Sequence, residues 1–163
     1  MAAVKLPKML PSTEHGSRMN ELTWHSAIRG YVLAIAGLNL LWEVVQLPLY
    51  TIWLSGSTQE IIVAVLHCTV GDAVIAISAL TLALILLGTG HWPKQRYLAV
   101  GVVAVLFGLT YTIYSERINV TSGAWSYSGL MPIIPWLGVG LSPVLQWIVI
   151  PGFCFWKLRK PTN

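Results

Sequence analysis

Charged residues are scarce in this chain of 163 residues. Asp, Glu, Lys and Arg together make up 10% of the sequence, whereas a soluble domain usually contains about 25%. Hydrophobic residues make up 55%, and the mean hydropathy is +0.68. The deficit excludes an ordinary soluble domain, because too little charge is present to cover a water-exposed surface. The composition predicts an integral membrane protein with the lipid bilayer as its partner, and the length predicts one domain.

Cysteines and recognisable catalytic motifs are also scarce. The two cysteines, Cys68 and Cys154, lie in apolar runs without a CxxC pattern, so we expect neither a disulfide framework nor a cysteine-based metal site. No GxSxG, HExxH, P-loop or GxGxxG pattern is present. The net charge of +4 comes from basic residues in the tails and one short loop, so nucleic-acid binding is not expected. We therefore predict no cofactor and no metal ion.

Long apolar runs are what the sequence has instead. A bilayer core about 30 Å thick requires about 20 helical residues. Because backbone polar groups in lipid must be satisfied within the segment, such runs are expected to be helices. The sequence predicts an all-α integral membrane protein, with residues 29–156 forming a four-helix transmembrane bundle. The predicted spans are about 29–54, 61–88, 97–115 and 135–156.

The charges outside these runs predict the orientation. Lys and Arg occur in the polar tail (1–28), in the second connection (88–96) and in the basic tail (157–163), whereas the first connection (55–60) has none. Because positively charged segments remain on the cytoplasmic side, we predict a multi-pass protein with both termini cytoplasmic. The polar tail has room for a short interfacial helix before the first span.

The third connection, residues 116–134, is long and apolar for a loop. It contains Trp, Tyr and Met and leads into the sequence MPIIP. We predict that it folds back over the bundle as a lid-like or re-entrant loop between helices 3 and 4. The alternative is an interfacial loop that lies among the lipid headgroups.

The first apolar run carries a single polar stripe. Asn39, Glu43, Gln46 and Tyr50 are spaced by four, three and four residues, which places them on one face of a helix. A charged group at the bilayer centre costs at least about 2.5–3.5 kcal/mol. The stripe is therefore predicted to face the interior of the bundle.

Polar residues of the second run lie at a similar predicted depth. With a rise of 1.5 Å per residue, Glu43, His67 and Asp72 all fall between the bilayer centre and the outer face, whereas the cytoplasmic half of the runs is nearly all aliphatic. The sequence therefore predicts a polar cavity that opens outward or laterally. His67 and Asp72 could line two sides of this cavity, or one of them could pair with the first helix.

A further pattern occupies residues 116–151. An acidic residue and a Gly-x-aromatic-x-Tyr segment precede a proline, the run LGVGL (137–141) and a Pro-x-x-x-Trp segment. The matching residues are Glu116, Gly123, Trp125, Tyr127, Pro132, Pro143 and Trp147. This order resembles membrane-embedded carotenoid hydratases, which implies an isoprenoid-type substrate and acid chemistry on a carbon–carbon double bond. The architecture is also similar to four-helix sterol-isomerase-type membrane domains.

The leading hypothesis is an enzyme that acts by general acid–base chemistry on a hydrophobic lipid or isoprenoid, as a hydratase or isomerase would. Glu43 or Asp72 would donate a proton, and His67 would relay or accept one. Trp125 and Tyr127 would cover the cavity and stabilise positive charge. The predicted catalytic residues are Glu43, His67, Asp72 and Glu116. The predicted substrate-binding residues are Asn39, Gln46, Tyr50, Tyr111, Tyr114, Asn119, Trp125, Tyr127, Gln146 and Trp147.

Two other functions would use the same residues. One is transport or proton relay, which would require a homo-oligomer because four helices are few for a monomeric transporter. The other is a structural or assembly subunit whose polar groups bind a partner membrane subunit. Loss of turnover in a folded Glu43→Gln variant would favour the enzyme over both.

Overall fold

A computed structural model describes the backbone of residues 13–158 and the side chains of residues 24–158. It contains four long helices: α1 (Thr13–Gln46), α3 (Thr58–Leu87), α4 (Tyr97–Ser122) and α5 (Leu141–Leu158). The short elements are the 3-10 turn η1 (Leu47–Leu49), α2 (Ile52–Ser55), β1 (Ile133–Ile134) and β2 (Val139–Gly140). The four long helices are each long and apolar enough to cross a membrane, which supports the predicted multi-pass membrane protein.

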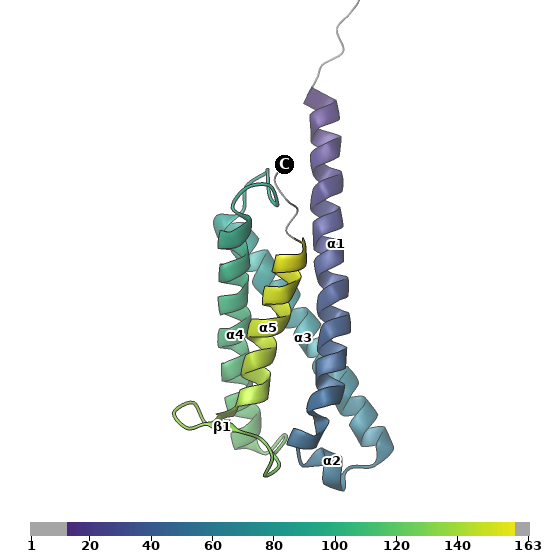
Figure 1. Ribbon diagram of the computed structural model, residues 1–163, viewed down its shortest axis with the longest axis vertical. Helices are drawn as coiled ribbons and strands as arrows, with labels where there is room; N and C mark the ends of the chain where they lie inside the picture. The colour runs from purple at the N-terminus through teal and green to yellow at the C-terminus, as the bar shows by residue number, and fades with distance from the viewer. Residues whose placement is uncertain (1–12, 159–163) are drawn as a thin grey trace, which may run out of the picture.

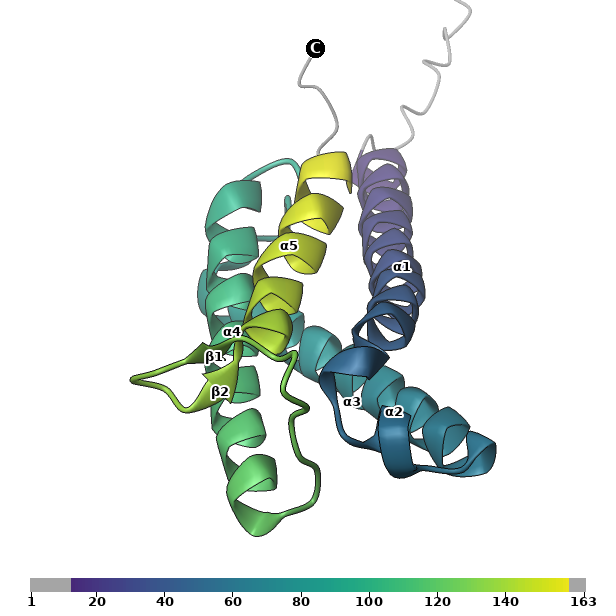
Figure 2. The same cartoon turned by 60° about the horizontal axis from the view of Figure 1, so that its bottom comes forward.

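The long helices pack side by side in a closed ring. α1 contacts α3 and α5, and α4 contacts the same two helices. Figures 1 and 2 show that the start of α1 and the end of α5 lie at one end of the molecule, which we call the terminal end. α2 and the β1–β2 hairpin lie at the opposite end, which we call the loop end. This antiparallel arrangement is the one that alternating spans require.

The helix boundaries differ from the predicted spans. α1 begins at Thr13 and runs without a break, so part of the predicted polar tail extends the first helix instead of forming a separate one. It ends at Gln46 rather than near residue 54, because Pro48 lacks an N–H and the chain tightens into η1. α4 continues past residue 115 to Ser122, and α5 begins only at Leu141.

The third connection contains a short hairpin that an all-α prediction misses. β1 pairs antiparallel with β2, with Ile133 opposite Gly140. The connection begins at Gly123, which has φ of +75° and donates its N–H to carbonyls of the last turn of α4. Since this left-handed conformation is favourable mainly for glycine, Gly123 ends α4 and turns the chain back.

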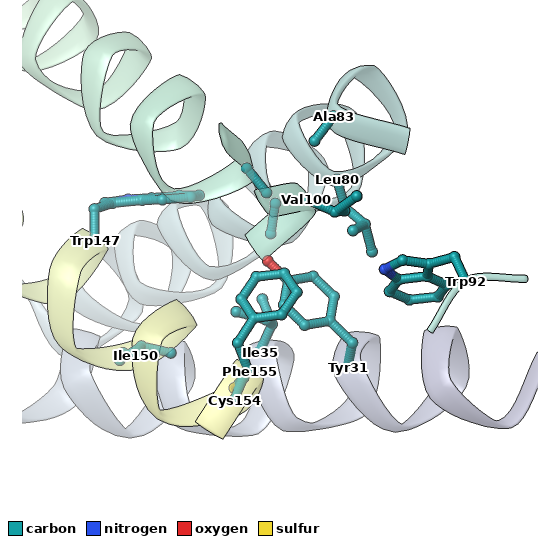
Figure 3. Packing of buried hydrophobic residues seen from close by; sticks show 12 residues of the cluster. Tyr31, Ile35, Leu80, Ala83, Trp92, Val100, Trp147, Ile150, Cys154 and Phe155 are labelled. Carbon is teal, nitrogen blue, oxygen red and sulfur yellow. The ribbon is translucent and has the colours of Figure 1, made fainter. Parts of the chain in front are cut away.

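The apolar core lies nearer the terminal end. Tyr31 and Ile35 of α1 face Val100 of α4 and Phe155 of α5, and Figure 3 shows the aromatic rings of this cluster gathered between the helices. Trp92, from the connection between α3 and α4, is also buried there. This half of the bundle is therefore filled by apolar side chains.

Candidate functional site

Buried polar side chains gather between the apolar core and the loop end. α1 contributes Asn39, Glu43 and Gln46, which its helical spacing places on the inward face. α3 contributes the half-buried Asp72, and α5 contributes Gln146, which is only 2% exposed. We call these five residues the amide–carboxyl cluster. Three helices that are far apart in sequence therefore meet through polar groups at one level.

The side-chain amide of Gln146 is at the centre of this cluster. Its nitrogen lies 2.8 Å from Asn39 Oδ1, 3.0 Å from Glu43 Oε1 and 2.9 Å from Asp72 Oδ2. An amide NH₂ group has only two hydrogens, so three acceptors share them. Glu43 Oε1 also accepts a hydrogen bond of 2.8 Å from the amide of Gln46. The amides thus hold both carboxyl groups in fixed positions.

Glu43 and Asp72 form a carboxyl pair across α1 and α3. Glu43 Oε1 and Asp72 Oδ2 accept hydrogen bonds of 3.0 Å and 2.9 Å from the same Gln146 amide nitrogen, which brings the two carboxyl groups close together. Trp147 also interacts with Asp72, and none of the groups that act on either carboxyl is cationic. Among the described residues, the pair is therefore held by side-chain amide donors.

A second acidic group lies on α4. The Tyr127 hydroxyl donates a hydrogen bond to Glu116 Oε2 and accepts one of 2.9 Å from the Gly140 N–H. Tyr50 lies beside Tyr127, with 5.5 Å between ring centroids, and also interacts with Glu116. Burial, together with the nearby Glu116, raises the pKa of both phenols. Both therefore remain protonated hydrogen-bond donors.

The chain segments after α1 and after α4 are joined by backbone hydrogen bonds. The Thr51 N–H donates to the Ser126 carbonyl, and the Ser128 N–H donates to the Leu49 carbonyl, each at 2.9 Å. The Ser128 hydroxyl donates to the Pro48 carbonyl at 2.8 Å. This pairing places Trp125 and Tyr127 over the loop end of the bundle.

A cavity of about 1040 Å³ opens at the loop end, between the end of α1, residues 47–57, the first half of α3 and residues 119–126. Glu43 is the cluster carboxyl on its wall; Asp72 and Gln146 are not among the lining residues. The other predicted site residues that line it are Gln46, Tyr50, His67, Asn119 and Trp125. Across the described part of the chain, no three His, Cys, Asp or Glu side chains are grouped as metal ligands.

Several predicted site residues lie away from this cavity. Tyr111 and Tyr114 are 53% and 61% exposed on the outside of α4 and are not among the lining residues. Trp147 is buried against Gly108, where it supports the cluster from behind. Glu116 and Tyr127 are also absent from the lining, although Trp125 connects them to it.

Three residues of the site were not predicted. The Trp42 indole donates to the Ser142 hydroxyl at 3.2 Å, and Ser142 donates to the Gln46 amide oxygen at 2.8 Å. Cys68 lines the cavity and interacts with the cluster carboxyls and with Glu116. The spacing of four between Ser142 and Gln146, and between Cys68 and Asp72, was a usable signal, because it places each pair on one helix face.

The fold and the site define a mostly helical protein with four membrane-type helices and a buried carboxyl pair beside a cavity at one end. Comparisons with protein-family models, with curated proteins and with solved structures found no match. The functional argument therefore depends on the geometry of the site and on the local resemblance over residues 116–151.

Proposed function

We propose that the protein is an intramembrane enzyme that transfers a proton to and from an unsaturated, isoprenoid-type molecule. The observation that carries this proposal is the position of Glu43. Glu43 lies on the cavity wall, and its Oε1 accepts hydrogen bonds from the amides of Gln46, which also lines the cavity, and of Gln146, which does not. A carboxyl that is held from behind and open in front is suited to general acid catalysis.

In the proposed reaction, Glu43 donates its proton to one carbon of a carbon–carbon double bond, and the neighbouring carbon becomes a carbocation. The negative charge left on Glu43 and Asp72 is stabilised by the amide hydrogens of Gln46 and Gln146. The aromatic rings of Tyr50 and Trp125, which line the cavity, would stabilise the positive charge.

Two outcomes then return the enzyme to its starting state. If a proton leaves an adjacent carbon for Glu43, the double bond has moved and the reaction is an isomerisation. If water adds to the carbocation and its proton goes to Glu43, the product is an alcohol and the reaction is a hydration. His67 lines the cavity and could accept either proton first and pass it on. The resemblance to carotenoid hydratases supports a polyene as substrate.

The alternative of a proton relay or transporter is less well supported. The terminal half of the bundle is filled by buried apolar residues such as Ile35, Leu80, Val100 and Ile150. A relay would need a polar path through this layer. An assembly subunit would have polar groups left to bind a partner helix, whereas the cluster amides and carboxyls bond to one another.

The test is isotope transfer by purified protein in lipid nanodiscs. Lycopene and squalene are supplied as polyenes in D₂O or in ¹⁸O-labelled water, and products are separated and weighed by mass spectrometry. We expect deuterium in the recovered polyene or ¹⁸O in an alcohol, and loss of both in Glu43→Gln. Glu60→Gln is the matched control, because it removes a carboxyl at the cavity rim and glutamine preserves the helix cap. Transfer that survives Glu43→Gln would refute the proposal.

A further inference from the structure

The cavity has an unusual charge distribution. Glu43 lies at its inner end and Glu60 at its rim, and no Lys or Arg is among the described residues that line it. A ligand inside the cavity therefore meets carboxyl groups at both ends and no fixed cation.

The polarity of the wall also changes with depth. Along α3 the cavity is lined first by Glu60, then by Val63 and Ala64, and then by His67 and Cys68. At 1.5 Å per residue, this wall extends over about 12 Å. A polar rim, an apolar middle and an acidic inner end fit a molecule with a polar head and an unsaturated apolar body.

Trp125 provides a donor for such a polar head. It lines the cavity, and its indole nitrogen is buried without an acceptor in hydrogen-bond geometry, although the Glu116 carboxyl is near enough to interact with it. Buried polar groups are normally hydrogen-bonded. An oxygen atom of a bound molecule would therefore satisfy this N–H.

We propose that the site selects an uncharged isoprenoid-type alcohol and rejects the corresponding phosphate ester. This inference rests on the proposed function, because it specifies the substrate of the same cavity. A hydroxyl oxygen can accept the hydrogen bond from Trp125 at no electrostatic cost. A diphosphate at the rim would lie near the Glu60 carboxylate and would find no Lys or Arg among the described lining residues to pair with, so repulsion between like charges would disfavour it.

Binding of two matched ligands tests the proposal. Radiolabelled farnesol and farnesyl diphosphate have the same apolar chain and differ in the head, and equilibrium binding of each is measured on the intact protein in detergent. We expect farnesol to bind at least about 100-fold more tightly than the diphosphate, a difference that one unpaired anion justifies. Farnesol that does not bind, or diphosphate that binds as tightly, overturns the inference.

Two substitutions make the test specific to the cavity. Gln59→Lys places a cation among the lining residues at the rim, and we expect it to tighten diphosphate binding by about tenfold with little effect on farnesol. Leu130→Lys is the matched control, since Leu130 is exposed at the same end but is not among the lining residues. Equal effects of the two lysines would show that net charge, not the cavity, controls binding.

The role of Trp125 is measured separately. We expect Trp125→Phe to weaken the binding of farnesol by about fivefold to tenfold, because the alcohol accepts a hydrogen bond from the indole N–H. The binding of the hydrocarbon farnesene, which has no hydroxyl group, should not change. Equal weakening of both ligands would refute the hydrogen bond. If farnesol is preferred but no proton transfer is found, the proposed function is refuted and this inference is not. If a polyene is turned over but the diphosphate binds as tightly as farnesol, this inference is refuted and the proposed function is not.

Discussion

Replacing Gly108 by alanine tests the packing that supports the amide–carboxyl cluster. A Cβ at this position would lie 2.2 Å from Cζ3 and 2.4 Å from Cε3 of Trp147. Non-bonded carbon atoms in favourable contact are about 3.5–4.0 Å apart, so the indole ring would have to move by roughly 1.5 Å. Trp147 is 2% exposed and interacts with Asp72. The ring therefore cannot move without disturbing the carboxyl pair.

The expected change in the free energy of unfolding of Gly108→Ala is the sum of two opposing effects. Overpacking of a core costs about 1–3 kcal/mol, and alanine in place of glycine within a helix contributes about 1 kcal/mol of stability. Because the overlap involves a rigid ring, we expect the upper part of the first range, and a net loss of about 2 kcal/mol for Gly108→Ala. Gly37→Ala and Gly71→Ala are matched controls, since a Cβ at either position meets nothing within 4 Å; they should be neutral or slightly stabilising.

Thermal unfolding of the three variants in the same detergent, followed by near-ultraviolet circular dichroism, measures this difference. A double-mutant cycle with Trp147→Leu tests the contact between positions 108 and 147. The stability penalty of Gly108→Ala should largely disappear in the Trp147→Leu background, because the leucine leaves room for the Cβ. If Gly108→Ala is as stable as Gly71→Ala, or if the cycle shows no coupling, the close contact between α4 and α5 at this point is wrong.

Three further predictions concern the polar groups. Gln146→Leu keeps the approximate volume but removes the donor that Asn39, Glu43 and Asp72 share, so thermal unfolding should show a loss of about 2–4 kcal/mol. A loss below about 0.5 kcal/mol would contradict the network. Tyr127 has its pKa raised by burial and by its bond to Glu116. Above about pH 10 the unfolded state loses this proton while the folded state keeps it, so the free energy of unfolding should fall as the pH rises. The fall should be less steep in Tyr127→Phe than in the native protein. Identical slopes of stability against pH would refute this. Ser57→Ala removes the N-cap of α3 and should cost about 1 kcal/mol by unfolding, whereas Ser55→Ala, an exposed control, should change stability by less than about 0.5 kcal/mol.

Residue spacing located the buried polar groups but not their partners. The intervals among Asn39, Glu43 and Gln46 are a local property of one helix, so periodicity identifies the face that becomes buried. Gln146 is 103 residues from Glu43 along the chain, and only the packing of α5 against α1 brings the two together. Tyr50 was assigned to the same stripe, but Pro48 ends the helix, and Tyr50 instead pairs with Tyr127 in the loop.

The inward face of α4 could have been identified from its small residues and not from its tyrosines. Tyr111 and Tyr114 were predicted to bind substrate, yet the inward face of α4 consists of small residues from Gly101 to Gly108, followed by Thr112 and Glu116. Small residues allow close helix packing in membranes, so their spacing was the better indicator of the interior. Ser57 and Glu60 form the capping box at the start of α3. Their spacing is a recognised signal for a helix N-terminus, but both residues lie in the stretch that was predicted to be a connection.

The position of the cluster places two of its residues, Glu43 and Gln46, on the wall of the cavity at the loop end. Burying two carboxyl groups in a membrane is costly unless their hydrogen bonds are satisfied, and the donors come from α1 and α5 while the acceptors come from α1 and α3. The cluster is therefore complete only when all three helices are packed. The apolar core closes the terminal side of this layer, and α4 closes another side through the contact of Gly108 with Trp147. Glu43 lines the cavity at the loop end together with His67 and Trp125, so we expect substitutions at these two positions to alter the rate at which small molecules reach Glu43 without changing the carboxyl pair itself.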